Sequence, residues 1–192
     1  LIQRVVSSGL TPKIIAPDHG PIWRKNPQWI VEKYKTWSAQ KPTSKAVIVY
    51  ASMWQSTEKM ARAIAEGLAC RGIEVKFMCM DSCHRSDVMY ELLDAAAVVI
   101  GSSTLNNNML PQVADVTTYM KGLKPRNLQG FAFGSYGWSG EAAVQIEAVM
   151  KEMGVELTGE ALRAKNVPNE AVLKECYERG EALAEKICSA VG

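Results

Sequence analysis

The stretch Lys45-Ala-Val-Ile-Val-Tyr-Ala-Ser-Met-Trp-Gln-Ser-Thr57 runs from a buried strand through a polar loop to the start of a helix. Its apolar, β-branched part, residues 46–50, is typical of a strand in a parallel sheet. Apolar residues then recur at three- and four-residue spacing from Met60 onward, which predicts a helix over residues 56–70. A loop between such elements can bind phosphate, because its free N–H groups and the helix dipole converge on one point.

The loop of residues 52–57 contains hydroxyl groups but neither Lys nor Arg. It matches neither the G-x-x-x-x-G-K-[ST] motif of nucleotide triphosphate sites nor the G-x-G-x-x-G motif of dinucleotide sites. A single terminal phosphate held by neutral donors, as in flavin mononucleotide (FMN), fits it better. The alternative is an ordinary helix start in which Ser56 or Thr57 is the N-cap.

The rest of the chain continues the alternation of strand and helix. We expect strands over residues 46–50, 73–78, 96–100, 130–134 and 155–162. We expect helices over residues 56–70, around 88–93 after the caps Ser86 and Asp87, and over 110–122, 141–153 and 169–190. This order predicts an α/β fold with a doubly wound, five-stranded parallel sheet of the flavodoxin-like type.

Three polar loops, residues 52–57, 102–108 and 135–140, follow the carboxyl ends of predicted strands, where such sheets bind ligands. Asn side chains can both donate to and accept from a flavin pyrimidine edge, and aromatic rings can stack on the flavin. The alternatives are a tight turn for the Asn residues and a lid over the core for the aromatic ones. The candidate cofactor-binding residues are Ser52, Met53, Trp54, Gln55, Ser56, Thr57, Ser103, Thr104, Leu105, Asn106, Asn107, Asn108, Ser135, Tyr136, Gly137, Trp138, Ser139 and Gly140.

Residues 1–44 do not fit this alternation. We expect a strand at residues 14–16, a helix over residues 26–39 with Asn26 as its cap and Pro27 at its first position, and a linker at residues 41–44. The chain begins with Leu1 rather than Met, so we expect it to be a piece of a longer protein.

The composition narrows the range of partners and cellular locations that we expect for this chain. A net charge of +2 does not suggest a nucleic-acid partner, and no apolar run is long enough to span a membrane. The five cysteines are scattered without zinc-site spacing, which indicates reduced thiols and a cytoplasmic location.

The chain contains the stretches Ser52-Met-Trp-Gln-Ser-Thr-Glu-Lys-Met-Ala61, Gly101-Ser-Ser-Thr-Leu-Asn-Asn107 and Phe133-Gly-Ser-Tyr-Gly-Trp-Ser-Gly140. They resemble the FMN loops of flavodiiron proteins, also called A-type flavoproteins. The stretch Ala16-Pro-Asp-His-Gly-Pro-Ile-Trp-Arg24 is similar to the end of that family's metallo-β-lactamase-like diiron domain. Two positions depart from known patterns, since Ser103 replaces the family's usual Pro and Gln55 replaces the Gly of simpler flavodoxins.

The resemblance implies a remnant of the diiron domain with its linker over residues 1–44 and a flavodoxin-like FMN domain over residues 45–192. It also implies that His19 is an iron ligand, only in an intact parent. The family's H-x-E-x-D-H run is missing here, so we expect FMN but no diiron centre in this chain. In the family, the flavin takes electrons from a donor such as rubredoxin or a reduced cofactor. It passes them to the diiron centre of the other subunit in a head-to-tail homodimer, where oxygen or nitric oxide is reduced.

Other classes of function stay open at this point. A free-standing flavodoxin-type electron carrier would use the same loops, and so would an FMN-dependent NAD(P)H or quinone reductase. A receiver-like signalling domain is disfavoured, because it needs an acidic cluster at the strand ends to bind Mg²⁺.

Overall fold

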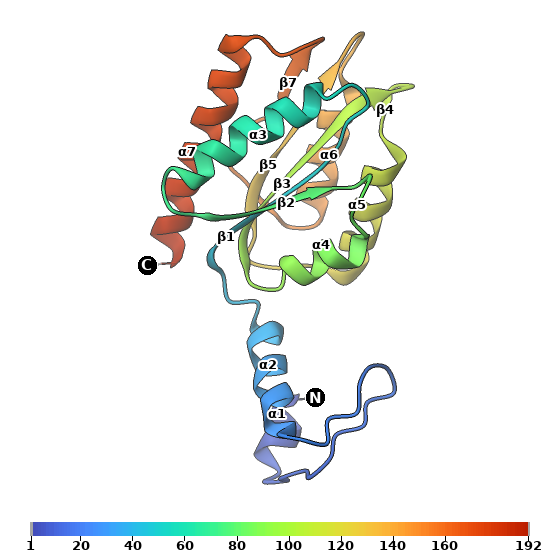
Figure 1. Ribbon diagram of the computed structural model, residues 1–192, viewed down its shortest axis with the longest axis vertical. Helices are drawn as coiled ribbons and strands as arrows, with labels where there is room; N and C mark the ends of the chain where they lie inside the picture. The colour runs from blue at the N-terminus through green and yellow to red at the C-terminus, as the bar shows by residue number, and fades with distance from the viewer. Residues whose placement is uncertain (1, 192) are drawn as a thin grey trace. The chain divides into compact units, whose positions relative to one another are not determined.

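The computed structural model describes residues 2–191. The chain forms two compact units, and the boundary between them in the sequence lies between Lys41 and Pro42. Unit 2, from Pro42 onward, contains a mixed sheet surrounded by helices (Figure 1). Its strands are β1 (Thr43–Ala51), β2 (Glu74–Cys79), β3 (Ala95–Leu105), β4 (Asn108–Met109), β5 (Gln129–Tyr136), β6 (Glu156–Leu157) and β7 (Leu162–Lys165). Its helices are α3 (Ser56–Ala69), α4 (Arg85–Glu91), α5 (Pro111–Leu123), α6 (Glu141–Glu152) and α7 (Glu170–Val191).

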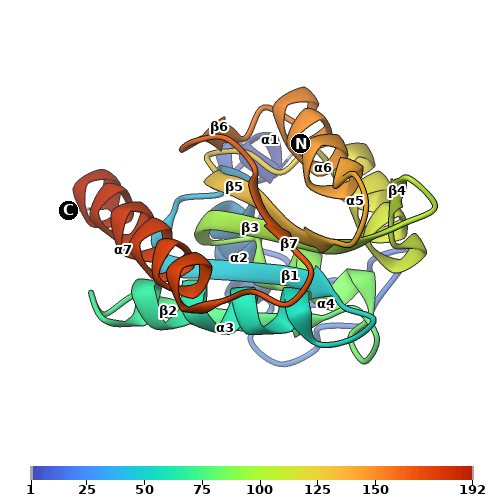
Figure 2. The same ribbon diagram turned by 90° about the horizontal axis from the view of Figure 1, so that it is seen from above.

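The sheet has the strand order β2-β1-β3-β5-β6, and each of these neighbours pairs in parallel. The short strand β7 also pairs in parallel with β5, and β4 pairs with β3 in the antiparallel direction. Helices α3 and α7 lie on one face, and α4, α5 and α6 lie on the other (Figure 2). The predicted flavodoxin-like, doubly wound sheet is therefore confirmed.

The side chains of β1 contribute to the apolar core on both faces of the sheet. Ala46, Ile48 and Tyr50 pack with the α3 and α7 side, whereas Val47 and Val49 pack with the α4, α5 and α6 side. Because side chains alternate along a strand, an uninterrupted apolar run fills both layers of core. All five residues are buried.

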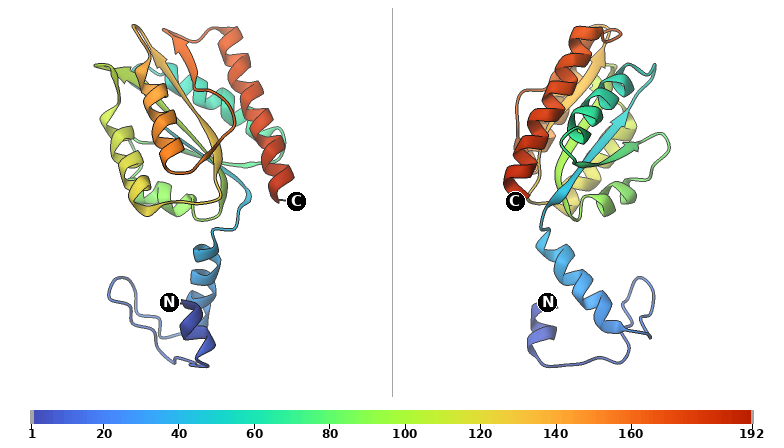
Figure 3. Two further views of the ribbon diagram at one scale, coloured as in Figure 1. Left: turned by 180° about the vertical axis from the view of Figure 1, so that it is seen from behind. Right: turned by 60° about the vertical axis from the view of Figure 1, so that its left-hand side comes forward.

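Helices α3 and α7 approach each other until their backbones touch (Figure 3). A Cβ added to Gly67 would lie 2.1 Å from the carbonyl oxygen of Tyr177, and one added to Gly180 would lie 2.3 Å from the carbonyl oxygen of Ile64. Only glycine permits such a distance, because any side chain would have to displace the opposite backbone.

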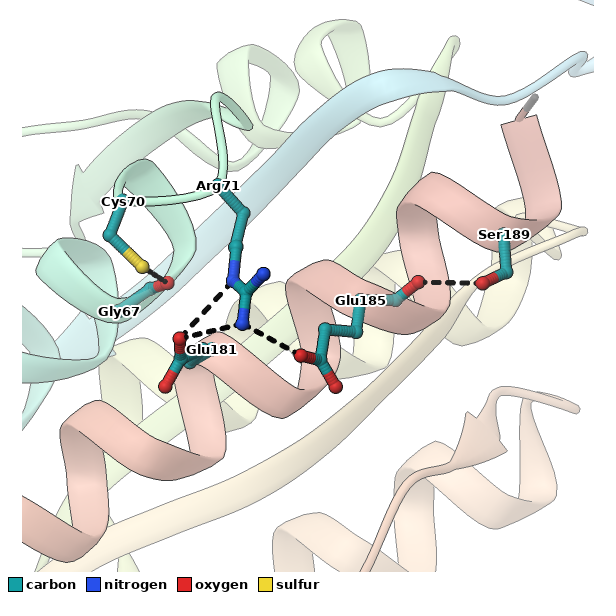
Figure 4. A network of polar contacts seen from close by, with 6 residues as sticks. All are labelled: Gly67, Cys70, Arg71, Glu181, Glu185 and Ser189. Carbon is teal, nitrogen blue, oxygen red and sulfur yellow. Dashed lines mark hydrogen bonds and ion pairs between the residues drawn. The ribbon is translucent and has the colours of Figure 1, made fainter.

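Two ion pairs also join α7 to Arg71, which lies just after the end of α3. The Arg71 guanidinium lies 2.9 Å from a carboxylate oxygen of Glu181 and 2.8 Å from one of Glu185 (Figure 4). These carboxylates raise the pKa of Arg71, with Glu181 contributing most. All three side chains are solvent-exposed or nearly so, so we assign the stability of the contact to the glycine backbones and the apolar core.

The predicted last strand, residues 155–162, is wrong in its extent. Two short strands take its place: β6 pairs with the beginning of β5, and β7 pairs with its end. Between them the chain leaves the ladder after Thr158, whose N–H still donates to the Gly130 carbonyl oxygen. The connection of Gly159 to Ala161 then carries the chain to the second position along the same edge of β5.

The predicted cap of the helix around residues 88–93 is also wrong. Helix α4 begins at Arg85, and His84 is its N-cap. The imidazole Nδ1 of His84 accepts from the N–H of Ser86 at 3.2 Å, and the carboxylate of Asp87 accepts from the N–H of His84 at 3.2 Å. Asp87 therefore completes a capping box from inside the helix.

Unit 1 contains α1 (Ile2–Ser7), which the sequence pattern did not predict, and α2 (Pro27–Ala39). Asn26 is the N-cap of α2, as predicted, but its side chain makes no capping hydrogen bond. The predicted strand at residues 14–16 is wrong: only Ile15 pairs, as an isolated bridge to Trp23. Pro12 and Pro17, which cannot donate to a ladder, bracket this segment. The predicted linker ends early, because β1 already begins at Thr43.

Among residues 2–191, no helix is both long enough and apolar enough to cross a membrane.

Candidate functional site at the carboxyl edge of the sheet

The first predicted loop connects β1 to α3 at the carboxyl edge of the sheet. Helix α3 begins at Ser56, and its N-cap is Gln55, whose side chain makes no capping hydrogen bond. The interpretation that Ser56 or Thr57 caps the helix is therefore wrong. The first helical N–H groups have no partner within the helix, so they can bind an anion.

Gln55 has a left-handed backbone, with φ 64°. This conformation is strained for a residue with a Cβ and relaxed for glycine, which explains why simpler flavodoxins would use glycine here. We expect Gln55→Gly to raise the unfolding free energy of the apoprotein by about 0.5–1 kcal/mol in urea titrations.

The matched control is Gln112→Gly in the first turn of α5, which should instead lose about 0.5 kcal/mol. If both variants lose stability equally, the left-handed geometry at Gln55 is not the one in solution.

Three hydroxyl groups from three different elements meet beneath this loop. The hydroxyl oxygen of Thr57 in α3 lies 2.9 Å from that of Ser103 in β3 and 2.8 Å from that of Ser135 in β5. The Ser103 and Ser135 oxygens are 3.4 Å apart. All three residues are buried, and we call them the hydroxyl cluster. The cluster joins the three predicted loops directly.

The second predicted loop is a hairpin, because β3 continues to Leu105 and the chain returns along β4. Its two-residue turn consists of Asn106 and Asn107, with φ 49° and 61°. Left-handed backbone at both positions is the signature of a type I′ turn, for which Asn is well suited. The tight-turn interpretation is thus confirmed for Asn106 and Asn107, whereas Asn108 already belongs to β4. We refer to residues 104–109 as the β3–β4 hairpin.

The third predicted loop is shorter than expected, because Ser135 and Tyr136 still belong to β5. Gly140 ends the loop with φ 78°, and a Cβ there would lie 2.8 Å from the ring of Tyr136. Trp138 is 94% exposed, and Trp54 in the first loop is 87% exposed. The alternative in which these rings form a lid over the core is therefore wrong for Trp54 and Trp138. Both indoles are free to contact a ligand.

A cavity of about 300 Å³ opens between these loops. Its lining residues are Met53, Trp54, Ser56, Ser103, Thr104, Ser135, Tyr136, Gly137, Asn166 and Val167. None of these described lining residues has a charged side chain. Asn166 and Val167, which follow β7, are not among the predicted residues. The N–H of Asn166 donates to the Tyr136 carbonyl oxygen at 2.7 Å.

The other predicted residues are not part of the lining of this cavity: Ser52, Gln55, Thr57, Leu105, Asn106, Asn107, Asn108, Trp138, Ser139 and Gly140. Thr57 is fully buried in the hydroxyl cluster.

Two buried oxygens near this edge have no hydrogen-bond partner within the part of the chain that the structure describes. They are the Oγ of Ser52, next to β1, and the Oε2 of Glu141, in the first turn of α6. A buried polar atom without a partner is costly, and a ligand can remove that cost.

Just before Ser52, burial raises the pKa of the Tyr50 hydroxyl well above its usual value, and Cys79 adds to this effect.

Unit 1 has a larger cavity of about 750 Å³, lined mainly by apolar side chains such as Leu10, Ile14 and Val31. Strand ends do not form it, so we place the candidate site in unit 2. His19 is exposed in unit 1. Among residues 2–191, no group of three or more His, Cys, Asp or Glu side chains is placed to hold a metal ion.

Comparison with known proteins agrees with this geometry. The protein family described as Flavodoxin matches residues 48–180. A nitric oxide reductase from Moorella thermoacetica is 43% identical over 187 residues, covering 97% of this chain and 47% of the relative.

Two solved structures are similar along the whole chain. Rubredoxin oxygen:oxidoreductase from Desulfovibrio gigas superposes with a TM-score of 0.93 at 42% identity, covering 100% of this chain and 48% of that one. The flavodiiron protein from Giardia intestinalis superposes with a TM-score of 0.89 at 29% identity, covering 99% and 48%. The chain thus spans about half the length of the curated relatives it matches.

Proposed function

The chain belongs to the flavodoxin family, and from this premise we propose that residues 45–192 bind FMN at the carboxyl edge of the sheet and use it to relay electrons. The predicted resemblance to flavodiiron proteins is confirmed by the similarity along the full chain. One observation carries the proposal: the ends of β1, β3 and β5 and the N-terminus of α3 converge on one uncharged cavity.

The residues present fit the phosphate of FMN. Among residues 2–191 the buried Oγ of Ser52 has no hydrogen-bond partner, and Ser52 belongs to the loop that leads into the open N–H groups at the start of α3. Ser56 lines the cavity and adds a hydroxyl donor. The helix dipole favours an anion at this point, so no cationic side chain is needed.

The residues also fit a flat ring. The exposed indoles of Trp54 and Trp138 offer apolar faces for stacking. The β3–β4 hairpin, with Asn106 and Asn107 at its tip, supplies backbone and amide groups that can both donate and accept hydrogen bonds. Thr57 orients the hydroxyls of Ser103 and Ser135 from below, so these two site loops keep a fixed spacing.

When bound, FMN accepts and releases electrons, and the protein supplies binding, orientation and electrostatic environment. We propose a rubredoxin-type donor, because one similar structure is a rubredoxin oxygen:oxidoreductase. A reduced cofactor other than a nicotinamide is the second proposed donor class.

We further propose that residues 1–44 are the end of a metallo-β-lactamase-like domain with its linker, and that His19 is an iron ligand in a longer parent protein. There the electrons would reach a diiron centre of the partner subunit in a head-to-tail homodimer and reduce oxygen or nitric oxide. The names of the relatives, an oxygen oxidoreductase and a nitric oxide reductase, support this class of activity. The cytoplasmic location and the absence of a nucleic-acid partner stay predictions.

FMN titration of the apoprotein tests the proposal. We expect the flavin fluorescence to be quenched with one-to-one stoichiometry at micromolar FMN, because the indoles flank the ring. Adding NADPH alone should not reduce the bound flavin rapidly, which separates an electron carrier from an NAD(P)H reductase. Failure to bind micromolar FMN would contradict the proposed function.

A further inference from the structure

The β3–β4 hairpin extends beyond the main sheet and has few ladder contacts of its own. Strand β3 pairs with β1 up to Ser102 and with β5 up to Ser103. Past these residues the ladder has the pairs Thr104 with Met109 and Leu105 with Asn108, and the Asn108 side-chain amide also donates to the Asn106 carbonyl oxygen at 2.9 Å. A two-stranded hairpin of this length is marginally stable in water. Its position must therefore depend on other contacts.

One side chain on α6 makes three of these contacts. The side-chain N–H groups of Gln145 donate to the Asn107 carbonyl oxygen at 2.9 Å and to the Oδ1 of Asn108 at 3.2 Å. Its Oε1 accepts from the N–H of Met109 at 3.1 Å. The half-buried Gln145 therefore bonds both to the turn, at Asn107, and to the returning strand β4.

This pattern requires a neutral amide. Gln145 uses its NH₂ group as a donor and its carbonyl oxygen as an acceptor at the same time. A carboxylate could accept from Met109 but could not donate to Asn107, and an apolar side chain could do neither.

Gln145 also links two parts of the site. It lies in the helix that directly follows the loop ending at Gly140. The same helix donates from the N–H of Ala142 to the hydroxyl of Thr104 at 3.4 Å, which is a weaker contact. The hairpin and the loop before α6 are thus fastened to a single rigid element.

We propose that Gln145 is a positioning residue that fixes the β3–β4 hairpin and thereby sets the relative affinity of the site for oxidised and reduced FMN. This inference rests on the proposed function. Hydrogen bonds from protein to the flavin ring tune its electronic state. A hairpin held at three points keeps the same donors and acceptors for both redox states, whereas a loose one adjusts to each.

The test compares Gln145→Met with Gln112→Met. Gln112 is an exposed residue of α5 whose amide donates to Asp81 at 3.2 Å, so its variant controls for the loss of a glutamine amide elsewhere. We would measure the dissociation constants of oxidised and reduced FMN, and the hydrogen exchange of the Met109 amide in the apoprotein. Gln145→Met should change the ratio of the two constants roughly three- to ten-fold, the value of one neutral hydrogen bond, and should speed exchange at Met109. Gln112→Met should change neither.

The outcomes separate the two claims. If the unmodified protein binds FMN and Gln145→Met leaves the ratio of constants unchanged, the role of Gln145 is refuted while the proposed function stands. An equal loss of affinity for both redox states would show a purely structural role and would also refute it. If the unmodified protein does not bind FMN, the proposed function fails first, and the inference fails with it. Unchanged exchange at Met109 in the apoprotein would refute the hairpin contact independently of any flavin.

Discussion

The variant Gly180→Ala is expected to lose about 2–4 kcal/mol of unfolding free energy, although it adds only one methyl group. The new Cβ would lie 2.3 Å from the carbonyl oxygen of Ile64, which is backbone and cannot rotate away. Helix α7 would have to move off α3 and loosen the packing of Leu183 and Ile187 in the core. Urea unfolding of the apoprotein, followed by circular dichroism, measures the loss.

The matched control is Gly122→Ala in α5. Gly122 is exposed, and a Cβ there would meet no atom within 4 Å. Alanine is the better helix former, so this variant should gain up to about 1 kcal/mol. Equal stability of Gly180→Ala and the unmodified protein would show that the two backbones do not touch in solution.

Riboflavin is expected to bind roughly 100- to 10,000-fold more weakly than FMN, since it lacks the phosphate. Two hydrogen bonds to a charged group, at about 1.5–3 kcal/mol each, account for this range. Ser52→Ala should weaken FMN binding about 10- to 100-fold through the loss of one such bond, while riboflavin binding stays the same. Fluorescence titrations with both flavins measure the four constants.

A stability measurement sharpens this prediction. The buried Oγ of Ser52 has no partner in the part of the chain that the structure describes, so its removal should leave the apoprotein as stable as before or more stable. Ser189→Ala, at an exposed position of α7 whose hydroxyl donates to the Glu185 carbonyl oxygen, controls for the change of serine to alanine. If Ser52→Ala weakens FMN and riboflavin binding by the same factor, Ser52 does not contact the phosphate.

The sequence pattern was sufficient for the sheet and for the edge where the site lies. Long apolar runs such as residues 96–100 identify buried parallel strands, and polar residues directly after them mark the carboxyl ends. The sequence pattern was insufficient where the length of a strand depends on pairing with strands far away in the sequence. Ser102 and Ser103 look like loop residues, yet β1 and β5 extend far enough to pair with them.

The missed site residues have the same kind of explanation. Asn166 lay outside the prediction because the last strand was placed at residues 155–162; with β7 at Leu162–Lys165, Asn166 directly follows a strand like the other loops. Gln145 carries no local signal at all. A glutamine in a helix looks like a surface residue, and only the folded hairpin brings its three partners to it.

The backbone contact between α3 and α7 has a consequence for the order in which the protein matures. Ribosomes make α7 after every other element of unit 2, yet α7 supplies the surface against which α3 is seated. Until α7 has left the ribosome, α3 and the proposed phosphate-binding turn before it lack this support. Under the proposed function, FMN binding would therefore follow the synthesis of α7.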